Sequence, residues 1–445
     1  MNAAYCIGEQ DQKNKLRNNN KNIALFCSSS SELLLMSKRK YETRFFNIFV
    51  ASVTKRIFVR EKYNTKKMIN ILTYNDIDPQ QWQSLVERSP YATWFQTPEA
   101  YQFYAANLEE MVPFVFAVAE EAKGTENGEA DMPASRLIAS SPYRLKAVCV
   151  GYITRERSAL KQFFTRRAII IGGPLLAEDA TDDEVAALLK AVKEVKGERL
   201  EVKGAEDSVA DNQASTPYTL HFTPIYIETR NFHDYSKWRT VFEANGFAYR
   251  PHLNFHVDTT SVEVVDKNLG KSRKRDIRTT IRDGVTPVLN PTIEQVREYY
   301  AILKDLYTTK VKTPLFSWHF FEQLYHTANG RFILTEYQGK IIGGTVCVVL
   351  PNKTVYEWFV CGVDGVYEHI FPSSYATYLG IRYAAENGCQ IFDMMGAGKP
   401  EEAYGVRDFK ARFGGEQVEH GRYLCICKPL LYWIGKLGVK LLKNR

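Results

Sequence analysis

A hairpin, a crossover helix and one further strand follow one another in the second half of the chain. Residues 341–350 (IIGGTVCVVL) and 354–362 (TVYEWFVCG) are β-branched and aromatic runs separated by Pro-Asn-Lys, which predicts an antiparallel hairpin. Residues 372–388 carry apolar side chains at helical spacing, with proline in the first turn and glycine just after the last. Residues 390–394 then form a short apolar strand. This order constrains the chain to an α/β fold.

The loop after this last strand is the strongest candidate for a functional site. It lies within residues 391–415, IFDMMGAGKPEEAYGVRDFKARFGG. Asp393 is the polar exception near the carboxyl end of the strand, where open α/β sheets place their ligands. The glycines do not form an NTPase phosphate loop, because Pro400 follows Lys399 where Ser or Thr is required. They let the backbone turn sharply beside a ligand.

The order of these elements and the 391–415 motif resemble the Fem-type (FemABX) aminoacyltransferases, whose two tandem acetyltransferase-like (GNAT) domains add amino acids to peptidoglycan precursors. The Phe-Lys-x-x-Phe-Gly unit at 409–414 is the most specific match, and fainter similarity covers residues 68–428. The resemblance implies an α/β chain with mixed sheets, built from two tandem GNAT-like acyltransferase domains.

Length and charge support a division into four parts. A chain of 445 residues exceeds what one core normally serves. Residues 1–67 hold 14 Lys and Arg against 5 Asp and Glu, whereas the rest holds 44 against 46. We therefore expect any anion site in the body to be a local patch. The expected parts are a basic, disordered extension or upstream translation (1–67), a first GNAT-like domain (68–240), a second that carries the catalytic motif (241–428), and a basic amphipathic helix (429–445).

Transfer of an aminoacyl group from an ester to an amine passes through a tetrahedral oxyanion and requires no protein nucleophile. The chain has no convincing Ser-His-Asp or Cys-His arrangement. The resemblance implies that the Phe409 backbone carbonyl accepts the proton of the amine and that the Lys410 ammonium stabilises the developing charge. The alternative for Lys410 is a surface lysine in a helical turn.

A basic run is the main candidate for phosphate binding. Lys271, Arg275, Arg278 and Arg282 are spaced by four, three and four residues, so they share one face of a predicted helix. This face is either simply solvated or a clamp for phosphates of tRNA or of a UDP-linked or lipid-linked precursor.

Further candidates for substrate binding are aromatic and polar residues near the motif. The aromatic ones pack in a core or line an acceptor pocket, and Asp393 either caps its strand or faces the crevice. The set consists of Tyr356, Trp358, Asp393, Tyr404 and Arg407.

Neither a metal nor a cofactor is expected. The eight cysteines are scattered without a Cys-x-x-Cys pair, which is typical of reduced thiols in a cytoplasmic protein. His252 and His256 with the cysteines at 425 and 427 match no common zinc spacing. Aminoacyl-tRNA is the expected donor substrate, and acyl-CoA is the alternative.

The C-terminal segment, residues 428–445, combines an apolar helical stripe with lysines on another face. Such a helix either lies at an anionic membrane surface or docks on the protein itself. None of the short apolar pieces in residues 1–67 approaches the ~18 residues of a membrane span. The expected location is cytoplasmic, peripheral on the inner face of the cell membrane if the first alternative holds.

Three functions remain open. The first is an aminoacyl-tRNA-dependent transferase acting on a lipid-linked (lipid II) or UDP-linked muramyl peptide during cell-wall biogenesis. The second is an N-acyltransferase of GNAT fold that uses acyl-CoA or an acyl carrier. The pyrophosphate signature Gln/Arg-x-x-Gly-x-Gly/Ala is missing before Pro372, which disfavours this second function. The third is a non-enzymatic membrane- or RNA-binding module.

Overall fold

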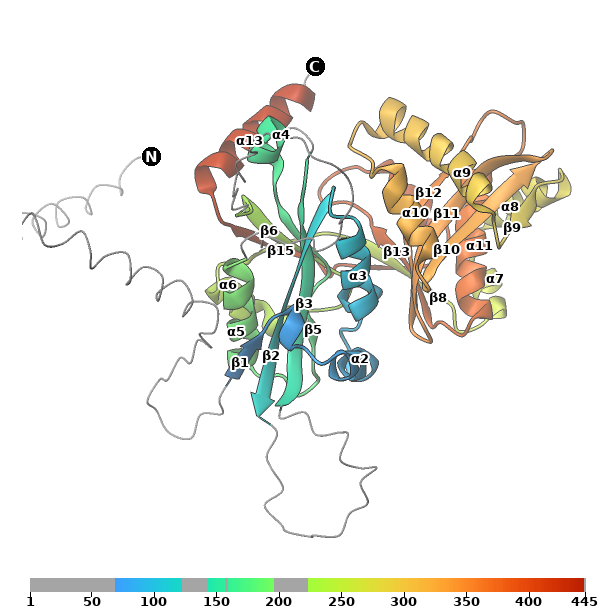
Figure 1. Ribbon diagram of the computed structural model, residues 1–445. Coiled ribbons are helices and arrows are strands. Elements are labelled where there is room, and N and C mark those ends of the chain that lie inside the picture. The colour runs from blue at the N-terminus through green and yellow to red at the C-terminus, as the bar shows by residue number, and fades with distance from the viewer. Residues whose placement is uncertain (1–68, 122–142, 157–158, 196–222, 444–445) are drawn as a thin grey trace, which may run out of the picture. The chain divides into compact units, whose positions relative to one another are not determined.

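The computed structural model describes residues 69–121, 143–156, 159–195 and 223–443. All of them belong to one compact unit, Thr65–Arg445 (Figure 1). The extension predicted for residues 1–67 lies outside the described residues.

The first sheet is mixed and has eight strands. Its order is β1-β2-β3-β4-β6-β15-β7, with β5 paired to β3, and β4 and β6 form its parallel pair. The strands are β1 (Ile69–Leu72), β2 (Met111–Glu121), β3 (Tyr143–Thr154), β4 (Ala168–Gly172), β5 (Leu175–Leu176), β6 (Tyr226–Asn231), β7 (Ala248–Arg250) and β15 (Arg422–Ile426).

Helices cover both faces of this sheet. Helices α2 and α3 pack through one apolar cluster, and α5 and α6 pack through another. The helices are α2 (Pro79–Arg88), α3 (Pro98–Ala106), α4 (Ala159–Thr165), α5 (Asp182–Lys193) and α6 (Arg239–Ala244), with 3₁₀ turns at Tyr74–Asp76, Trp94–Gln96 and Ser236–Trp238.

Local sequence signals set where these helices begin. Helix α5 starts with a capping box, in which the Glu184 amide donates to the Thr181 hydroxyl (3.4 Å) and the Thr181 amide donates to the Glu184 carboxylate (2.8 Å). The Thr97 hydroxyl caps α3 by accepting from the Ala100 amide at 3.1 Å, and proline follows at the first helical position.

The second sheet contains the predicted hairpin and crossover. Its order is β14-β8-β13-β12-β11-β10-β9, and β12 and β13 form its parallel pair. The antiparallel β11–β12 hairpin and the helix between β12 and β13 are confirmed. The strands are β8 (Asn254–Asp258), β9 (Thr286–Val288), β10 (Gly330–Tyr337), β11 (Lys340–Leu350), β12 (Thr354–Gly362), β13 (Ile391–Gly396) and β14 (Glu416–Val418).

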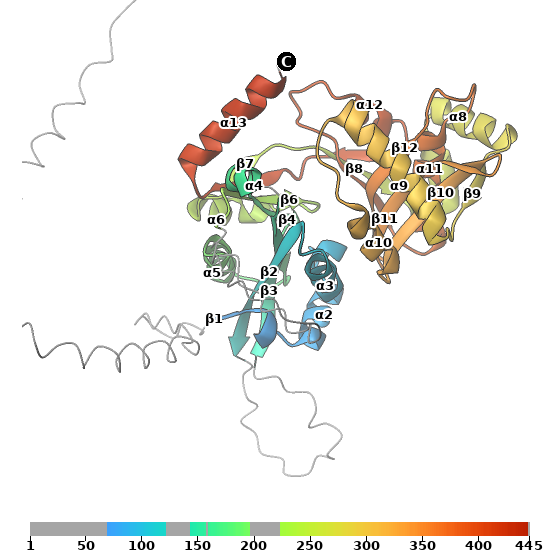
Figure 2. The same cartoon turned by 45° about the horizontal axis from the view of Figure 1, so that its top comes forward.

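Helices again lie on both faces of the second sheet (Figures 1 and 2). One face packs against α7, α8 and α11, and the other packs against α9 and α10. The bounds are α7 (Val262–Asn268), α8 (Lys271–Arg282), α9 (Ile293–Leu306), α10 (Trp318–His326), α11 (Pro372–Glu386), α12 (Gly405–Ala411) and α13 (Pro429–Lys443), with a π-helical turn at Tyr307–Val311.

The chain passes between the sheets more than once. Strands β7 and β8 are separated by Pro251, which lacks the amide that a continuing strand needs, and they join different sheets. Strand β15 then returns to the first sheet between β6 and β7. The domain boundary at 240/241 stays a prediction, and β7 and β15 lie on its C-terminal side.

One apolar cluster contains side chains from both sheets and their helices. The rings of Phe103 on α3 and Phe320 on α10 lie 5.0 Å apart. Polar contacts accompany them: the Ser317 amide donates to Glu110 (2.9 Å), and Asn329 Nδ2 donates to Glu99 (2.6 Å).

Candidate active site

The parallel pair β12–β13 opens at one end. The two strands pair over 354–356 and 391–393 only, although β12 continues to Gly362 and β13 to Gly396. The carbonyls at the end of β13 therefore lack partners on β12. Because buried carbonyls need donors, this opening must be filled by another group.

The Lys410 ammonium fills the opening. It donates to the carbonyls of Met394, Met395 (3.3 Å) and Gly396 (3.0 Å), and the residue is only 8% exposed. Its three N–H donors thus meet three carbonyls. Burial lowers the pKa of Lys410, and the negative charges of Glu357 and Asp393 oppose that shift. The result is a cation fixed at the carboxyl end of β13.

Lys410 lines a cavity of about 2610 Å³ whose walls come from both sheets. Phe409, Trp358 and Tyr404 line the same cavity. The structure thus brings together four of the residues that the sequence singled out. Tyr404 is 44% exposed, whereas Trp358 is half-buried among aromatic rings.

Glu357 is a cavity residue that sequence reasoning missed. The residue is 4% exposed, and its Oε1 accepts hydrogen bonds from Thr345 (3.2 Å) and Thr377 (2.9 Å). Its Oε2 is buried and has no hydrogen-bond partner among the described residues. Burial raises the pKa of Glu357, and the Lys410 charge and the two threonine hydroxyls oppose the shift. The signal was present, because Glu357 is the only charged residue in the apolar run 354–362.

Arg273 is a second missed residue, and it supports Phe409 from behind. It is buried on α8, where Nη1 donates to Ser374 (2.6 Å) on α11 and to Asp276 (3.3 Å). Its guanidinium lies 4.5 Å from the centre of the Phe409 ring and 5.1 Å from that of Phe413. Arg273 therefore joins α8 and α11 to the Phe-Lys-x-x-Phe-Gly unit.

Phe409 lies in the last turn of α12. In a continuing α-helix the Phe413 amide would donate to the Phe409 carbonyl. Here it donates to the Lys410 carbonyl instead, at 3.0 Å. The helix therefore ends where the carbonyl of Phe409 is proposed to act.

Apart from the three α8 cations, three predicted site residues do not line this cavity. Tyr356 is 1% exposed and stacks on Phe232 with the ring centres 5.4 Å apart, so it belongs to the core. Arg407 donates to the carbonyls of Ala397 (3.0 Å) and Lys399, which holds the glycine-rich loop in place.

The third is Asp393, which is 1% exposed and fully engaged. It accepts from Asn254 Nδ2 (2.8 Å), from the Met395 amide (2.6 Å) and from His256 Nε2 (3.1 Å). Burial alone would raise the pKa of Asp393, but the His256 charge and these hydrogen bonds lower it. Asp393 thus ties β13 to β8.

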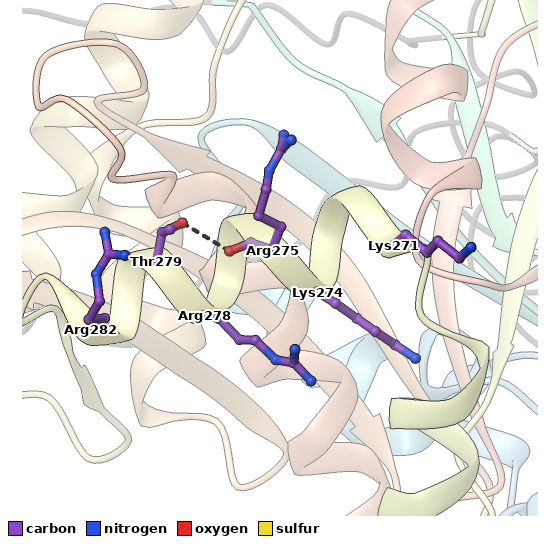
Figure 3. A pocket seen from close by; sticks show the side chains of 6 residues that line it. All are labelled: Lys271, Lys274, Arg275, Arg278, Thr279 and Arg282. Atoms are coloured by element: carbon purple, nitrogen blue, oxygen red, sulfur yellow. Dashed lines mark hydrogen bonds between the residues drawn. The ribbon is translucent and has the colours of Figure 1, made fainter.

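The predicted basic face of α8 forms a separate surface. Lys271, Arg275 and Arg278 are exposed and line a hollow of about 380 Å³ that shares no residue with the Lys410 cavity. Figure 3 shows Arg275 leaving the helix on the side opposite to Lys274 and Arg278. The structure therefore does not gather these cations around one point.

Helix α13 lies beside α4 (Figures 1 and 2). One edge faces the protein, where the Tyr432 ring meets Tyr226 at 5.5 Å between ring centres. Other apolar side chains are exposed: Leu430 is 71% and Trp433 is 62% exposed.

No helix in the described part of the chain is both long and apolar enough to traverse a bilayer. Nor do the described residues contain three or more His, Cys, Asp or Glu side chains grouped to hold a metal ion.

Comparisons with known proteins agree with this architecture. Residues 270–410 match the family model described as Acetyltransferase (GNAT) domain. FemX has the same fold, with a TM-score of 0.54 at 11% sequence identity over 80% of this chain and 98% of that chain. L-PGS from Bacillus licheniformis gives a TM-score of 0.46 at 12% identity over 81% and 96%. No curated protein matches significantly. The chain therefore has the Fem-type fold that its sequence predicted, with a GNAT acyltransferase domain in its second half.

Proposed function

We propose that this protein is an aminoacyltransferase that moves an aminoacyl group from charged tRNA to an amine of a peptidoglycan precursor, without a covalent intermediate. The observation that carries the proposal is the Lys410 ammonium, fixed on three carbonyls inside a cavity of about 2610 Å³. Sites for one small ligand span roughly 300–1,000 Å³, so this cavity has room for the reacting ends of two substrates.

The proposed reaction is a direct displacement. The amine nitrogen attacks the ester carbonyl carbon, the new C–N bond forms, and the C–O bond to the ribose breaks. The ribose oxygen gains a proton and the amine loses one. Lys410 stabilises the oxyanion by exchanging its longest contact, that to the Met395 carbonyl at 3.3 Å, for the developing negative charge. Such a donor is worth on the order of 3 kcal/mol, or at least a hundredfold in rate.

Phe409 is proposed to accept a hydrogen bond from the attacking amine through its backbone carbonyl. The Arg273 guanidinium, stacked 4.5 Å from the Phe409 ring centre, holds the end of α12 in place. Trp358 and Tyr404 are proposed to contact the substrates within the same cavity. No cofactor is needed, because the ester of the charged tRNA is already activated.

Two further surfaces are proposed to hold the substrates. The exposed α8 cations, Lys271, Arg275 and Arg278, suit phosphates of the tRNA. The segment 428–445 has no acidic residue, and Leu430 and Trp433 in its described part are exposed, which suits peripheral contact with an anionic membrane that carries a lipid-linked acceptor.

A second candidate is N-acylation from acyl-CoA or an acyl carrier. The match of residues 270–410 to an acetyltransferase domain favours it. The same Lys410 would stabilise the oxyanion formed from a thioester.

Both candidates are tested in one experiment with the full-length protein. It is incubated with a mixture of charged tRNAs or with acyl-CoAs, together with lipid-linked or UDP-linked muramyl peptide, and the acceptor is weighed by mass spectrometry. We expect a gain of one aminoacyl residue with charged tRNA, abolished by prior ribonuclease treatment. A gain with acyl-CoA alone would replace the proposal by the second candidate, and no gain in any arm would refute both.

A further inference from the structure

Three arginines lie side by side across the first sheet. Arg230 on β6 is directly opposite Arg422 on β15, and Arg422 is directly opposite Arg250 on β7. Residues directly opposite one another on antiparallel strands project from the same face of a sheet. All three line the cavity that contains Lys410. We call them the arginine row.

The arginine row carries more positive than negative charge. Glu228 is its carboxylate partner, accepting from Arg422 Nη1 (2.9 Å) and Arg230 Nε (3.0 Å). Burial would raise the pKa of Glu228, but the two arginines lower it to about 2, so it is ionised. His252 Nε2 lies 2.8 Å from Arg422 Nη2. Burial and the Arg422 charge lower the pKa of His252 to about 4. His252 is therefore neutral near pH 7, and the row keeps two uncompensated charges.

Several donors in the row are unused. Within the described part of the chain, Arg230 meets a protein acceptor only through Nε, and the side chain of Arg250 meets none. Arg422 Nε is buried and meets no acceptor among the residues that the structure describes. Like charges placed directly opposite one another destabilise a sheet, so the protein bears a cost that an anion would remove.

We propose that the arginine row binds a diphosphate of the acceptor substrate. Guanidinium forks match phosphate oxygens with two parallel hydrogen bonds. The Cα atoms of directly opposite residues lie roughly 5 Å apart, so the three Cα atoms of the row span about 10 Å. This width suits two linked phosphates better than one. Glu228 holds two of the three arginines in position. Assignment to the acceptor rests on the proposed function, whereas diphosphate binding itself does not.

Two kinds of molecule carry such a group, a nucleotide-linked and a lipid-linked acceptor. The cavity wall continues from the row to apolar side chains of α4 and α13, Phe164, Leu431 and Ile434. Beyond them, Trp433 and Leu437 are exposed. A lipid chain attached to the diphosphate would thus find an apolar path out of the cavity.

The first experiment measures pyrophosphate binding to the full-length protein by calorimetry, so it does not depend on the transfer reaction. Arg230→Gln and Arg250→Gln should each weaken binding about tenfold or more, because each removes a charged donor to phosphate. Arg382→Gln, on the exposed face of α11, makes the same change of charge elsewhere and should stay within twofold. Sulfate should bind more weakly than pyrophosphate.

Thermal unfolding shows whether the variants are folded. Pyrophosphate should raise the melting temperature of the wild type, since it binds the folded state, and should do so less in the two row variants. Arg250→Gln without ligand should melt at or above the wild-type temperature, because it removes one of the repelling charges.

Three results would overturn the proposal. They are absence of pyrophosphate binding, equal binding by the row variants, and loss of binding in Arg275→Gln/Arg278→Gln on α8 while the row variants bind normally. A competition step then identifies the source. UDP that displaces pyrophosphate supports a nucleotide-linked acceptor, and displacement only by a polyprenyl diphosphate in detergent supports a lipid-linked one. If neither competes, assignment to the acceptor is wrong.

Discussion

Replacing Glu357 by glutamine tests the electrostatics of the candidate site. Glu357 is 4% exposed, and its Oε2 has no hydrogen-bond partner in the part of the chain that the structure describes. Glutamine keeps an oxygen for the Thr345 and Thr377 hydroxyls, which now bond Oε1. The substitution therefore removes the ionisation with little change in packing. We expect Glu357→Gln to be more stable than the wild type at neutral pH.

The sign follows from the pKa of Glu357, which burial raises above its usual 4.5. A raised carboxyl pKa means that the folded state binds the proton more tightly than the unfolded state does. The contribution of the protonated Glu357 carboxyl to stability is thus complete below about pH 4.5, and it is lost as the pH rises through the folded pKa. The advantage of Glu357→Gln should grow over this window to about 1.4 kcal/mol for each unit by which the folded pKa exceeds the unfolded one.

Urea unfolding of the wild type and Glu357→Gln between pH 5 and 8 measures the difference in their free energies of unfolding. Glu401→Gln, on an exposed loop, is the control for exchanging a carboxylate for an amide. In a Lys410→Met background the advantage should grow further, because Lys410 opposes the rise of the Glu357 pKa. The coupling should fall in the range of about 0.5–3 kcal/mol for interacting residues. A stability difference that does not change with pH would refute the reasoning.

Three further substitutions test neighbouring contacts. Arg273→Ala should lower the free energy of unfolding by about 2 kcal/mol, because it removes the charged donor to Ser374 and leaves Asp276 with Arg275 alone, and chemical denaturation measures this. Gly414→Ala should cost at least ~2 kcal/mol in the same assay, because φ is 78° and the added Cβ would lie 2.1 Å from the Asn268 carbonyl oxygen. His256→Ala should destabilise most at low pH. Burial alone would lower the pKa of His256, but Asp393 raises it above 6.5, so its contribution is complete below that value and is lost as pH rises through the folded pKa. Denaturation at pH 6 and 8 should show the smaller loss at pH 8.

Local signals predicted much of the architecture. The hairpin, the crossover helix and α8 follow from residue periodicity and turn residues, which act over a few positions. The return of β15 to the first sheet has no such signal, because pairing between residues nearly two hundred positions apart depends on tertiary packing. The arginine row could not be recognised for the same reason.

The orientation of the β12 side chains could not be predicted from the sequence either. The β11–β12 register shifts where Val346 faces Phe359 and Cys347 faces Glu357, so Trp358 is the extra residue of a bulge. The bulge lets Trp358 and Phe359 pack into the same cluster, which strict alternation forbids. Glu357 points to the other face, towards α11, while Tyr356 stays in the core.

The proposed aminoacyl transfer depends on the charge of Lys410. The most direct test is the single-turnover rate of Lys410→Met with charged tRNA and saturating acceptor, compared with Lys399→Met, which removes an exposed lysine of the same cavity. With both variants folded by circular dichroism, we expect Lys410→Met to be at least about a hundredfold slower than the wild type and Lys399→Met to stay within a few fold. A wild-type rate from Lys410→Met would contradict the account.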